Sequence, residues 1–270
     1  MSRDVAWGAP LLGGTVMVLA GAGPGLGAQI ARDATAAGAR VVLGARRAGY
    51  LKELAAELGD AGGDVRIQPC DVTSDAECRG LVSLAEEEFG QVDSLVCNAF
   101  ASGRAYGQTI EEADIDGWQD AFDVNVFGSL RMVKAAIPAL KRSRQGSVVF
   151  VGSQIVRRVF AGRGPYAASK AALLTTAQIL ARELGPYGIR VNTVVPGRMW
   201  GPALQKYIER LVVERDTSFE QELARMVGDV SMPELSTDEE SARVVVFLAS
   251  ALAAGMTGQS VDVNAGETFH

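Results

Sequence analysis

The sequence predicts a single α/β domain built on a doubly wound parallel β-sheet with helices on both faces, and three observations lead to it. Short apolar runs alternate along the chain with longer segments of helical character. The first of these runs passes directly into a glycine-rich turn that opens a helix. The chain has 270 residues, of which 48% are hydrophobic, so one sizeable core can form.

The first strand is expected at Thr15–Ala20, a short apolar run of the kind that lies inside a parallel sheet. A turn with three glycines follows, and then a helix over residues 28–37. In this turn Gly21 permits a sharp bend, Gly25 lets the backbone approach a phosphate, and Gly27 allows close packing of helix on strand. The N–H groups and the positive dipole end of the helix would face the same anion. The segment is therefore a candidate phosphate site, with an ordinary glycine-rich turn as the alternative.

The remaining strands and helices continue the alternation to the end of the chain. Strands are expected at Arg40–Ala45, Val65–Cys70, Val92–Cys97, Ser147–Val151, Ile189–Val195 and Gln259–Val263. Helices are expected at 48–58, 75–89, 118–140, 165–184 and 238–252. Ser74 with Glu77 predicts a capping box at the start of one helix, and Ser236 or Thr237 caps the last.

Residues 198–233 interrupt this rhythm, because they are more polar and carry many charges. They are expected to form one or two amphipathic helices outside the sheet. An insertion at the carboxyl edge of a parallel sheet suits a lid over a ligand, and surface helices with no gating role are the alternative. We therefore divide the chain into a loose N-terminal extension over 1–13 and one catalytic domain over 14–270, with 198–233 as its substrate lid region.

The end of the second strand bears on the choice of dinucleotide. An NAD site usually has an acidic residue there, which accepts a hydrogen bond from the ribose. This chain has Ala45, followed by Arg46 and Arg47. A guanidinium binds a 2′-phosphate that a carboxylate would repel. The sequence therefore favours NADP(H), with NAD(H) possible, and two solvated arginines are the alternative.

Three polar side chains are candidates for chemistry. Tyr166 and Lys170 lie four residues apart on one helix face, and Ser153 follows the apolar run that precedes that helix. An ammonium close to a phenol would lower the pKa of Tyr166 and make it a proton donor or acceptor. Ser153 would hold a carbonyl or hydroxyl oxygen. A surface tyrosine with a solvated lysine is the alternative.

Composition excludes several classes of function. The net charge of −6 argues against a nucleic-acid partner. The single histidine, His270, argues against a Ser-His-Asp triad or a histidine-rich metal site, and Cys70, Cys78 and Cys97 lack the spacing of metal ligands. No metal is therefore expected. No apolar run reaches about 18 residues and no signal peptide opens the chain, so we expect no membrane span and a cytoplasmic location.

Several motifs follow one another along the chain, namely Gly21/Gly25/Gly27, Asp71, Asn98–Ala99, Asn125, Ser153, Tyr166/Lys170 and Pro196–Gly197. Taken in this order, they make the chain resemble the short-chain dehydrogenase/reductase family from about Gly14 to Gly266. The resemblance implies a Rossmann-like fold and hydride transfer between a nicotinamide cofactor and a carbonyl or secondary alcohol. It also implies a homotetramer, or a homodimer, whose shared faces are the helices at 118–140 and 165–184.

The resemblance implies a role for each matching residue. Ser153 would bind the substrate oxygen, Tyr166 would pass the proton, and Lys170 would bond the nicotinamide ribose and tune Tyr166. Asn125 would hold a water that joins Lys170 to solvent. The implied cofactor contacts run from the phosphates through the adenosine to the nicotinamide: Gly21, Gly25, Leu26, Gly27, Arg46, Arg47, Asp71, Val72, Asn98, Ala99, Tyr166, Lys170, Pro196 and Gly197.

The chain departs from the family pattern at three positions. Phe100 replaces a glycine, so either the local backbone differs or the ring points to the substrate pocket. Ala20 replaces a threonine before the glycine turn, and Gly201 stands where threonine or serine is usual. A contact to the nicotinamide carboxamide is then lost or supplied by the lid.

The leading interpretation is an NADP(H)-dependent oxidoreductase acting on a small carbonyl or alcohol. A largely apolar substrate is suggested by the expected pocket residues Phe100, Gln154, Val156, Met199 and Trp200. One alternative is a 3-oxoacyl-[acyl-carrier-protein] reductase, whose acidic partner would meet a basic entrance formed by Arg157, Arg158 and Arg163. Another is a catalytically silent dinucleotide-binding regulatory protein. An enoyl reductase is disfavoured, because that branch of the family spaces its tyrosine and lysine more widely.

Overall fold

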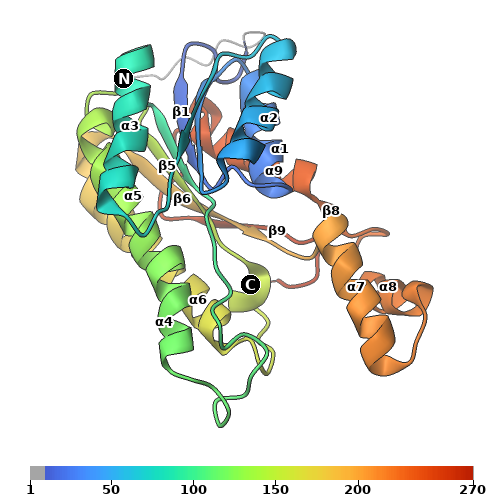
Figure 1. The fold of residues 1–270 in the computed structure, drawn as a ribbon. Coiled ribbons are helices and arrows are strands. Elements are labelled where there is room, and N and C mark those ends of the chain that lie inside the picture. The colour runs from blue at the N-terminus through green and yellow to red at the C-terminus, as the bar shows by residue number, and fades with distance from the viewer. Residues whose placement is uncertain (1–9, 270) are drawn as a thin grey trace.

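Seven parallel strands form the central sheet of the computed structural model, in the order β3-β2-β1-β4-β5-β6-β9 (Figure 1). The structure describes residues 10–269; residues 1–9 of the expected N-terminal extension, and His270, lie outside the described residues. The strands of this sheet are β1 Val16–Ala20, β2 Arg40–Ala45, β3 Val65–Pro69, β4 Ser94–Cys97, β5 Ser147–Val151, β6 Arg190–Pro196 and β9 Ser260–Val263. Two short strands, β7 Met199–Trp200 and β8 Ser236–Thr237, pair with each other apart from it.

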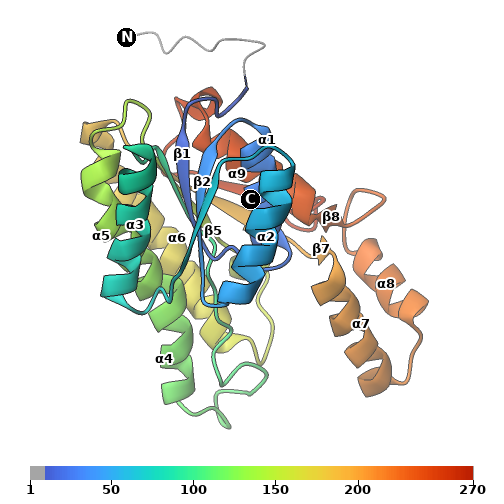
Figure 2. The same cartoon turned by 45° about the horizontal axis from the view of Figure 1, so that its top comes forward.

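Helices cover both faces of the sheet, as the doubly wound prediction requires (Figures 1 and 2). They are α1 Leu26–Ala36, α2 Ala48–Asp60, α3 Asp75–Phe89, α4 Asp116–Phe122, α5 Ser129–Leu140, α6 Gly164–Leu184, α7 Pro202–Arg215, α8 Phe219–Gly228 and α9 Asp238–Ala249. One core lies between the sheet and α3, α5 and α6, and the other lies between the sheet and α1, α2 and α9. The predicted fold class is confirmed.

The strand β1 shows why apolar runs of this length form the sheet. All five of its residues are buried. Val16 and Val18 belong to the core under α3, whereas Met17 and Leu19 belong to the core under α1. Successive side chains of a strand point to opposite faces, so a strand covered on both sides must be apolar throughout.

The start of α3 forms only half of the predicted capping box. The Ser74 hydroxyl accepts a hydrogen bond from the Glu77 N–H at 3.3 Å. The Glu77 carboxylate, however, accepts from the N–H of Asp71 at 2.7 Å rather than from the capping residue. At α9 the box is complete, with Thr237 and Glu240 exchanging both bonds.

The helix expected at 118–140 is interrupted by one wide turn. A π-helical segment, Asp123–Gly128, joins α4 to α5. Asn125 lies in this segment and is fully buried. A Cβ on Gly128 would lie 2.6 Å from Val72 Cγ2, so glycine lets the segment pack closely on the loop after β3.

The packed domain begins before the boundary expected at residue 14. Leu12 is buried in the core beside α1, and its N–H donates to the carbonyl of Ala37 at 2.8 Å. Of the expected extension, residues 10–13 are therefore part of the domain.

The helices α7 and α8 form the predicted insertion at 198–233 and project from the body of the molecule (Figures 1 and 2). They share a small core of their own, made by Ile208, Leu211 and Met226 with Leu235. Among residues 10–269, no helix combines the length and apolar character needed to cross a membrane.

Candidate active site

The carboxyl ends of the parallel strands bring the predicted site residues to one edge of the sheet. Ser153 lies two residues beyond β5, and α6 carries Tyr166 and Lys170. The hydroxyl of Ser153 and the phenol of Tyr166 line the same cleft, and Ser153 lies close enough to affect the pKa of Tyr166. Lys170 is buried, with its Nζ donating to the carbonyl of Val151 at 2.7 Å and lying 5.8 Å from the centre of the Tyr166 ring. The structure thus gathers these three side chains.

The pKa values of Tyr166 and Lys170 differ from what the sequence predicted. Burial raises the pKa of Tyr166, and the neighbouring Ser153 hydroxyl opposes that rise. The expected lowering by Lys170 does not hold in this structure, because the ammonium faces the Val151 carbonyl rather than the phenol. Desolvation lowers the pKa of Lys170 itself to about 8. At neutral pH the site therefore holds a protonated phenol next to a lysine close to its titration point.

Asn125 holds the loop after β4 against α6. Its Oδ1 accepts from the Ala101 N–H, and its Nδ2 donates to the Ala101 carbonyl and to the Ser169 hydroxyl, each at 2.8 Å. These bonds use both of its side-chain N–H groups. The side chain is thus a positioning group, and the water implied between Asn125 and Lys170 stays a prediction.

The glycine turn after β1 is built by close backbone approach. Gly21 has a φ of +100°, and a Cβ on it would lie 2.2 Å from the N of Ala99. A Cβ on Gly27 would lie 2.3 Å from the carbonyl oxygen of Gly21. Asn98 donates from Nδ2 to that same oxygen at 2.7 Å, so it ties the end of β4 to the turn. This cradle at the N-terminus of α1 fits a dinucleotide phosphate.

Two further residues complete the turn. Leu26 is the first residue of α1 and is buried. Gly25 has a φ of +82°, and a Cβ on it would lie 3.3 Å from Oδ2 of Asp238. Burial raises the pKa of Asp238.

The adenosine side is less tightly defined. Arg46 and Arg47 are exposed after β2, and the Arg47 guanidinium lies 5.6 Å from the centre of the Tyr50 ring. Asp71 forms a turn, since its Oδ1 accepts from the N–H and hydroxyl of Thr73 at 2.9 and 2.8 Å. These bonds lower the pKa of Asp71. Val72 is buried against the π-helical turn. The contact of Asp71 with an adenine stays a prediction.

Pro196 ends β6, and Gly197 lies where backbone segments meet. The Gly197 N–H donates to the Val263 carbonyl at 2.9 Å. A Cβ on Gly197 would lie 2.7 Å from Cα of Asn264 and 3.0 Å from Oε1 of Gln154. Only glycine permits this approach without displacing a neighbour.

Aromatic rings flank Tyr166 on two sides. Phe100 meets it edge-on at 6.3 Å between ring centres, although 62% of Phe100 is exposed. The Phe100 ring therefore points to the active site, which is one of the two outcomes expected for this departure from the family pattern. Tyr106 makes a second edge contact at 6.3 Å. No motif singles out Tyr106 in the sequence, because it lies in an irregular loop.

A cleft of about 970 Å³ opens beside Ser153 and Tyr166. The helices α7 and α8 form one of its walls. Its lining is both apolar and strongly basic, and includes Tyr106, Phe160, Leu204, Tyr207, Leu211 and Met226 with Arg158, Arg163, Arg198, Arg215 and Arg225. Of the expected pocket residues, Gln154 lines this cleft, whereas Val156, Met199 and Trp200 are not part of its lining. Arg157 is also absent from it, because its guanidinium bonds to Ser260 at 2.6 Å.

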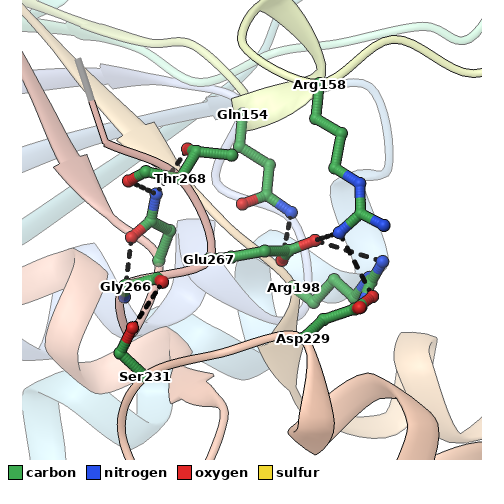
Figure 3. Close-up of polar contacts among 9 residues, drawn as sticks. Gln154, Arg158, Arg198, Asp229, Ser231, Gly266, Glu267 and Thr268 are labelled. Carbon is green, nitrogen blue, oxygen red and sulfur yellow. Dashed lines mark hydrogen bonds and ion pairs between the residues drawn. The ribbon is translucent and has the colours of Figure 1, made fainter.

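A buried carboxylate fastens the C-terminal segment next to the cleft (Figure 3). The side chain of Glu267 is fully buried and accepts from Gln154 Nε2 at 2.6 Å and from Arg158 and Arg198 at 3.1 Å. Asp229 contacts the same two arginines at 3.2 and 3.0 Å. The sequence could not reveal this cluster, because its members come from distant segments.

Comparison with known proteins yields a consistent set of similarities. The sequence model of the family described as enoyl-(acyl carrier protein) reductase matches residues 21–268. The chain is 32% identical over 252 residues to the short-chain reductase protein NovJ of Streptomyces niveus, covering 93% of each chain. It is 28% identical over 255 residues to a 7alpha-hydroxysteroid dehydrogenase of Bacteroides fragilis, covering 94% of this chain and 95% of that one.

A third relative is much longer than this chain. The match to a glycine betaine reductase of Emericella nidulans is 38% identical over 186 residues. It covers 69% of this chain but only 14% of that protein. The similarity therefore concerns one part of the larger enzyme.

Solved structures share the fold over nearly the whole chain. An NAD⁺-bound xylitol dehydrogenase has a TM-score of 0.87 at 26% identity, covering 94% of this chain and 99% of that one. An actinorhodin polyketide ketoreductase with NADPH has a TM-score of 0.84 at 31% identity, covering 92% of this chain and 95% of that one. Both proteins carry a nicotinamide dinucleotide.

Proposed function

Because this chain belongs to the short-chain dehydrogenase/reductase family, we propose that it is an NADP(H)-dependent oxidoreductase that interconverts a carbonyl and a secondary alcohol. The observation that carries this proposal is that Ser153 and Tyr166 line the same cleft, with the buried Lys170 one helical turn further along α6. Relatives named as dehydrogenases and reductases support the same reaction type.

The residues of the chain divide the reaction between them. A bound nicotinamide supplies or accepts the hydride. Tyr166 donates a proton to the carbonyl oxygen during reduction, for which a raised pKa keeps the phenol protonated at neutral pH. Ser153 donates a second hydrogen bond to the same oxygen and so stabilises the developing alkoxide. Lys170 would hold the ribose and, with its pKa of about 8, can supply a proton to the site near neutral pH.

The proposed cofactor contacts follow the glycine turn and the ends of the strands. Gly21, Gly25, Leu26 and Gly27 would hold the phosphates, Asp71 and Val72 the adenine, and Asn98 and Ala99 the neighbouring backbone. Pro196 and Gly197 would line the nicotinamide pocket. Arg46 and Arg47 would face a 2′-phosphate, because both side chains are exposed. The preceding residue is Ala45 rather than an acidic residue, which supports NADP(H) over NAD(H).

The cofactor preference is tested by titrating NADPH and NADH against the wild type, Arg46→Ala and Arg47→Ala. We expect NADPH to bind more tightly than NADH, and Arg46→Ala to weaken NADPH about tenfold while leaving NADH unchanged. Arg47→Ala is expected to weaken NADPH less than Arg46→Ala does, since the Arg47 guanidinium lies beside the Tyr50 ring. Equal affinity for NADH, unaffected by either variant, would contradict the NADP(H) preference.

The reaction itself is tested by following NADPH oxidation with a panel of activated ketones. Wild type is expected to turn over at least one member, and Tyr166→Phe to lose about 10²–10⁴-fold in kcat while still binding NADPH. Cofactor binding without turnover of any ketone or secondary alcohol would favour the catalytically silent regulatory protein. A 3-oxoacyl-[acyl-carrier-protein] reductase would instead show turnover of carrier-bound substrates above that of the free ketones.

A further inference from the structure

Arg163 lies in the cleft with its charge unpaired. It caps α6 at a position three residues before Tyr166. Its guanidinium carbon lies 4.1 Å from the centre of the Tyr106 ring, and one of its N–H groups donates to the Tyr207 hydroxyl at 3.4 Å. Among residues 10–269, no carboxylate lies within ion-pair distance of Arg163.

The other arginines of the cleft all have carboxylate partners. Arg158 and Arg198 share two carboxylates, those of Asp229 and Glu267. Arg215 and Arg225 share one carboxylate, because both contact the buried Glu222, at 3.0 and 2.6 Å.

The cleft thus carries more positive than negative charge, in a chain whose net charge is −6. Part of that excess comes from Arg163 and part from the pair on the lid. Clefts of one sign attract ligands of the other sign and raise their local concentration. An anionic ligand would therefore enter this cleft in preference to a neutral one.

The setting of Arg163 suits recognition of an anion. A guanidinium stacked on an aromatic face keeps its in-plane N–H groups available for a carboxylate or a phosphate. The ring on which it stacks, Tyr106, also contacts Tyr166 at 6.3 Å between ring centres. One aromatic ring therefore separates this cation from the proposed proton donor, a separation that a small substrate can span.

We propose that Arg163 binds an anionic group, a carboxylate or a phosphate, on the substrate whose carbonyl or alcohol reacts at Tyr166. The inference rests on the proposed function and names its substrate class. Apolar contacts to Phe160, Leu204 and Met226 would hold the carbon frame between the two ends. The substrate is then amphipathic, in place of the largely apolar molecule that the sequence suggested.

Binding is measured first, without any reaction. Ligand-observed NMR compares benzoate, phenyl phosphate and neutral methyl benzoate on the wild type, Arg163→Gln, Arg163→Lys and Arg210→Gln. The last is the matched control, because Arg210 also lies over the Tyr207 ring, at 5.1 Å, but does not line the cleft. We expect an anion to bind the wild type, about tenfold more weakly to Arg163→Gln, and with partial recovery in Arg163→Lys.

The outcomes of the binding experiment separate the possibilities. Tighter binding of benzoate identifies a carboxylate as the preferred group, and tighter binding of phenyl phosphate identifies a phosphate. Loss of affinity in Arg163→Gln alone supports the proposal. If neither anion binds the wild type, or if Arg163→Gln binds them equally well, the proposal is wrong.

Turnover then separates this inference from the proposed function. NADPH oxidation is compared for 4-acetylbenzoate and its methyl ester. We expect a higher kcat/KM for the acid, and a roughly tenfold drop in the acid-to-ester ratio in Arg163→Gln with little change for the ester. Equal kcat/KM values for acid and ester would overturn the inference and keep the oxidoreductase. Arg163-dependent anion binding without turnover of any ketone would overturn the oxidoreductase and keep the anion site.

Discussion

At the scale of single residues, the buried ammonium of Lys170 links stability to pH. Its pKa is about 8 in the folded protein, below the value of about 10.4 for a lysine in an unfolded chain. Below pH 8 the fold therefore holds a charge in a dry site, which costs stability. Between about pH 8 and 10.4 the unfolded chain binds more protons than the folded one, so this contribution to the free energy of unfolding rises with pH.

This pH dependence can be isolated by comparing the wild type with Lys170→Met. We expect the free energy of unfolding of the wild type to rise, relative to that of Lys170→Met, by about 3 kcal/mol between pH 7 and pH 10.5. Urea unfolding at several pH values measures it. The exposed Lys52→Met is the control and should show no such trend. A pH-independent difference for Lys170→Met would contradict the shifted pKa.

The carboxylate of Glu267 gives a second prediction at this scale. Its replacement in Glu267→Gln removes the charge that Arg158 and Arg198 share with Asp229 beside Gln154. We expect a loss of about 2 kcal/mol in the free energy of unfolding, because both arginines are partly exposed and water offsets part of the cost. Thermal and urea unfolding check this. Glu234→Gln, on an exposed residue of the same region, should be neutral.

At the scale of elements, the glycine turn between β1 and α1 has no room for a side chain. A Cβ in Gly27→Ala would lie 2.3 Å from the Gly21 carbonyl and 2.8 Å from Asn98 Nδ2. The turn must then move. We therefore expect NADPH to bind at least tenfold more weakly, and we expect the free energy of unfolding to fall by less than the binding free energy does. Fluorescence titration measures the affinity. Gly49→Ala on α2 meets no atom within 4 Å and should bind as the wild type does.

At the scale of the whole molecule, we propose a homotetramer, or a homodimer, assembled through the long helices. Phe127 is 51% exposed and shares a surface hollow with Ile115, Trp118 and Phe122, and Ile179 on α6 is 54% exposed. Burying such side chains between copies would stabilise an assembly.

Light scattering after size exclusion tests the assembly. We expect the wild type to elute as an oligomer and Phe127→Asp to shift toward the monomer, because a charge would be buried in the interface. Val213→Asp, on the 84%-exposed Val213 of the lid, should leave the mass unchanged. A monomeric wild type would contradict the proposal.

The fold class and nearly every element of the sheet could be predicted from the sequence alone. Strands such as β2 and β5 begin and end where predicted, because a strand covered on both faces must be apolar throughout and must stop where the polar turn begins. The insertion at 198–233 was likewise predictable, because its polar and charged residues interrupt the alternation of strands and helices. Ser153, Tyr166 and Lys170 could be singled out because their spacing and place in the alternation already confine them to one edge of the sheet.

Tertiary structure alone decided what surrounds those residues. The direction of the Lys170 ammonium toward a backbone carbonyl, and the raised pKa of Tyr166, follow from burial and not from spacing. The contacts of Tyr106 and the cluster around Glu267 join segments far apart in the chain, and local pattern carries no information about such pairings. The unpaired charge of Arg163 also depends on tertiary structure, because the carboxylates near the cleft lie beside the other arginines and not beside this one.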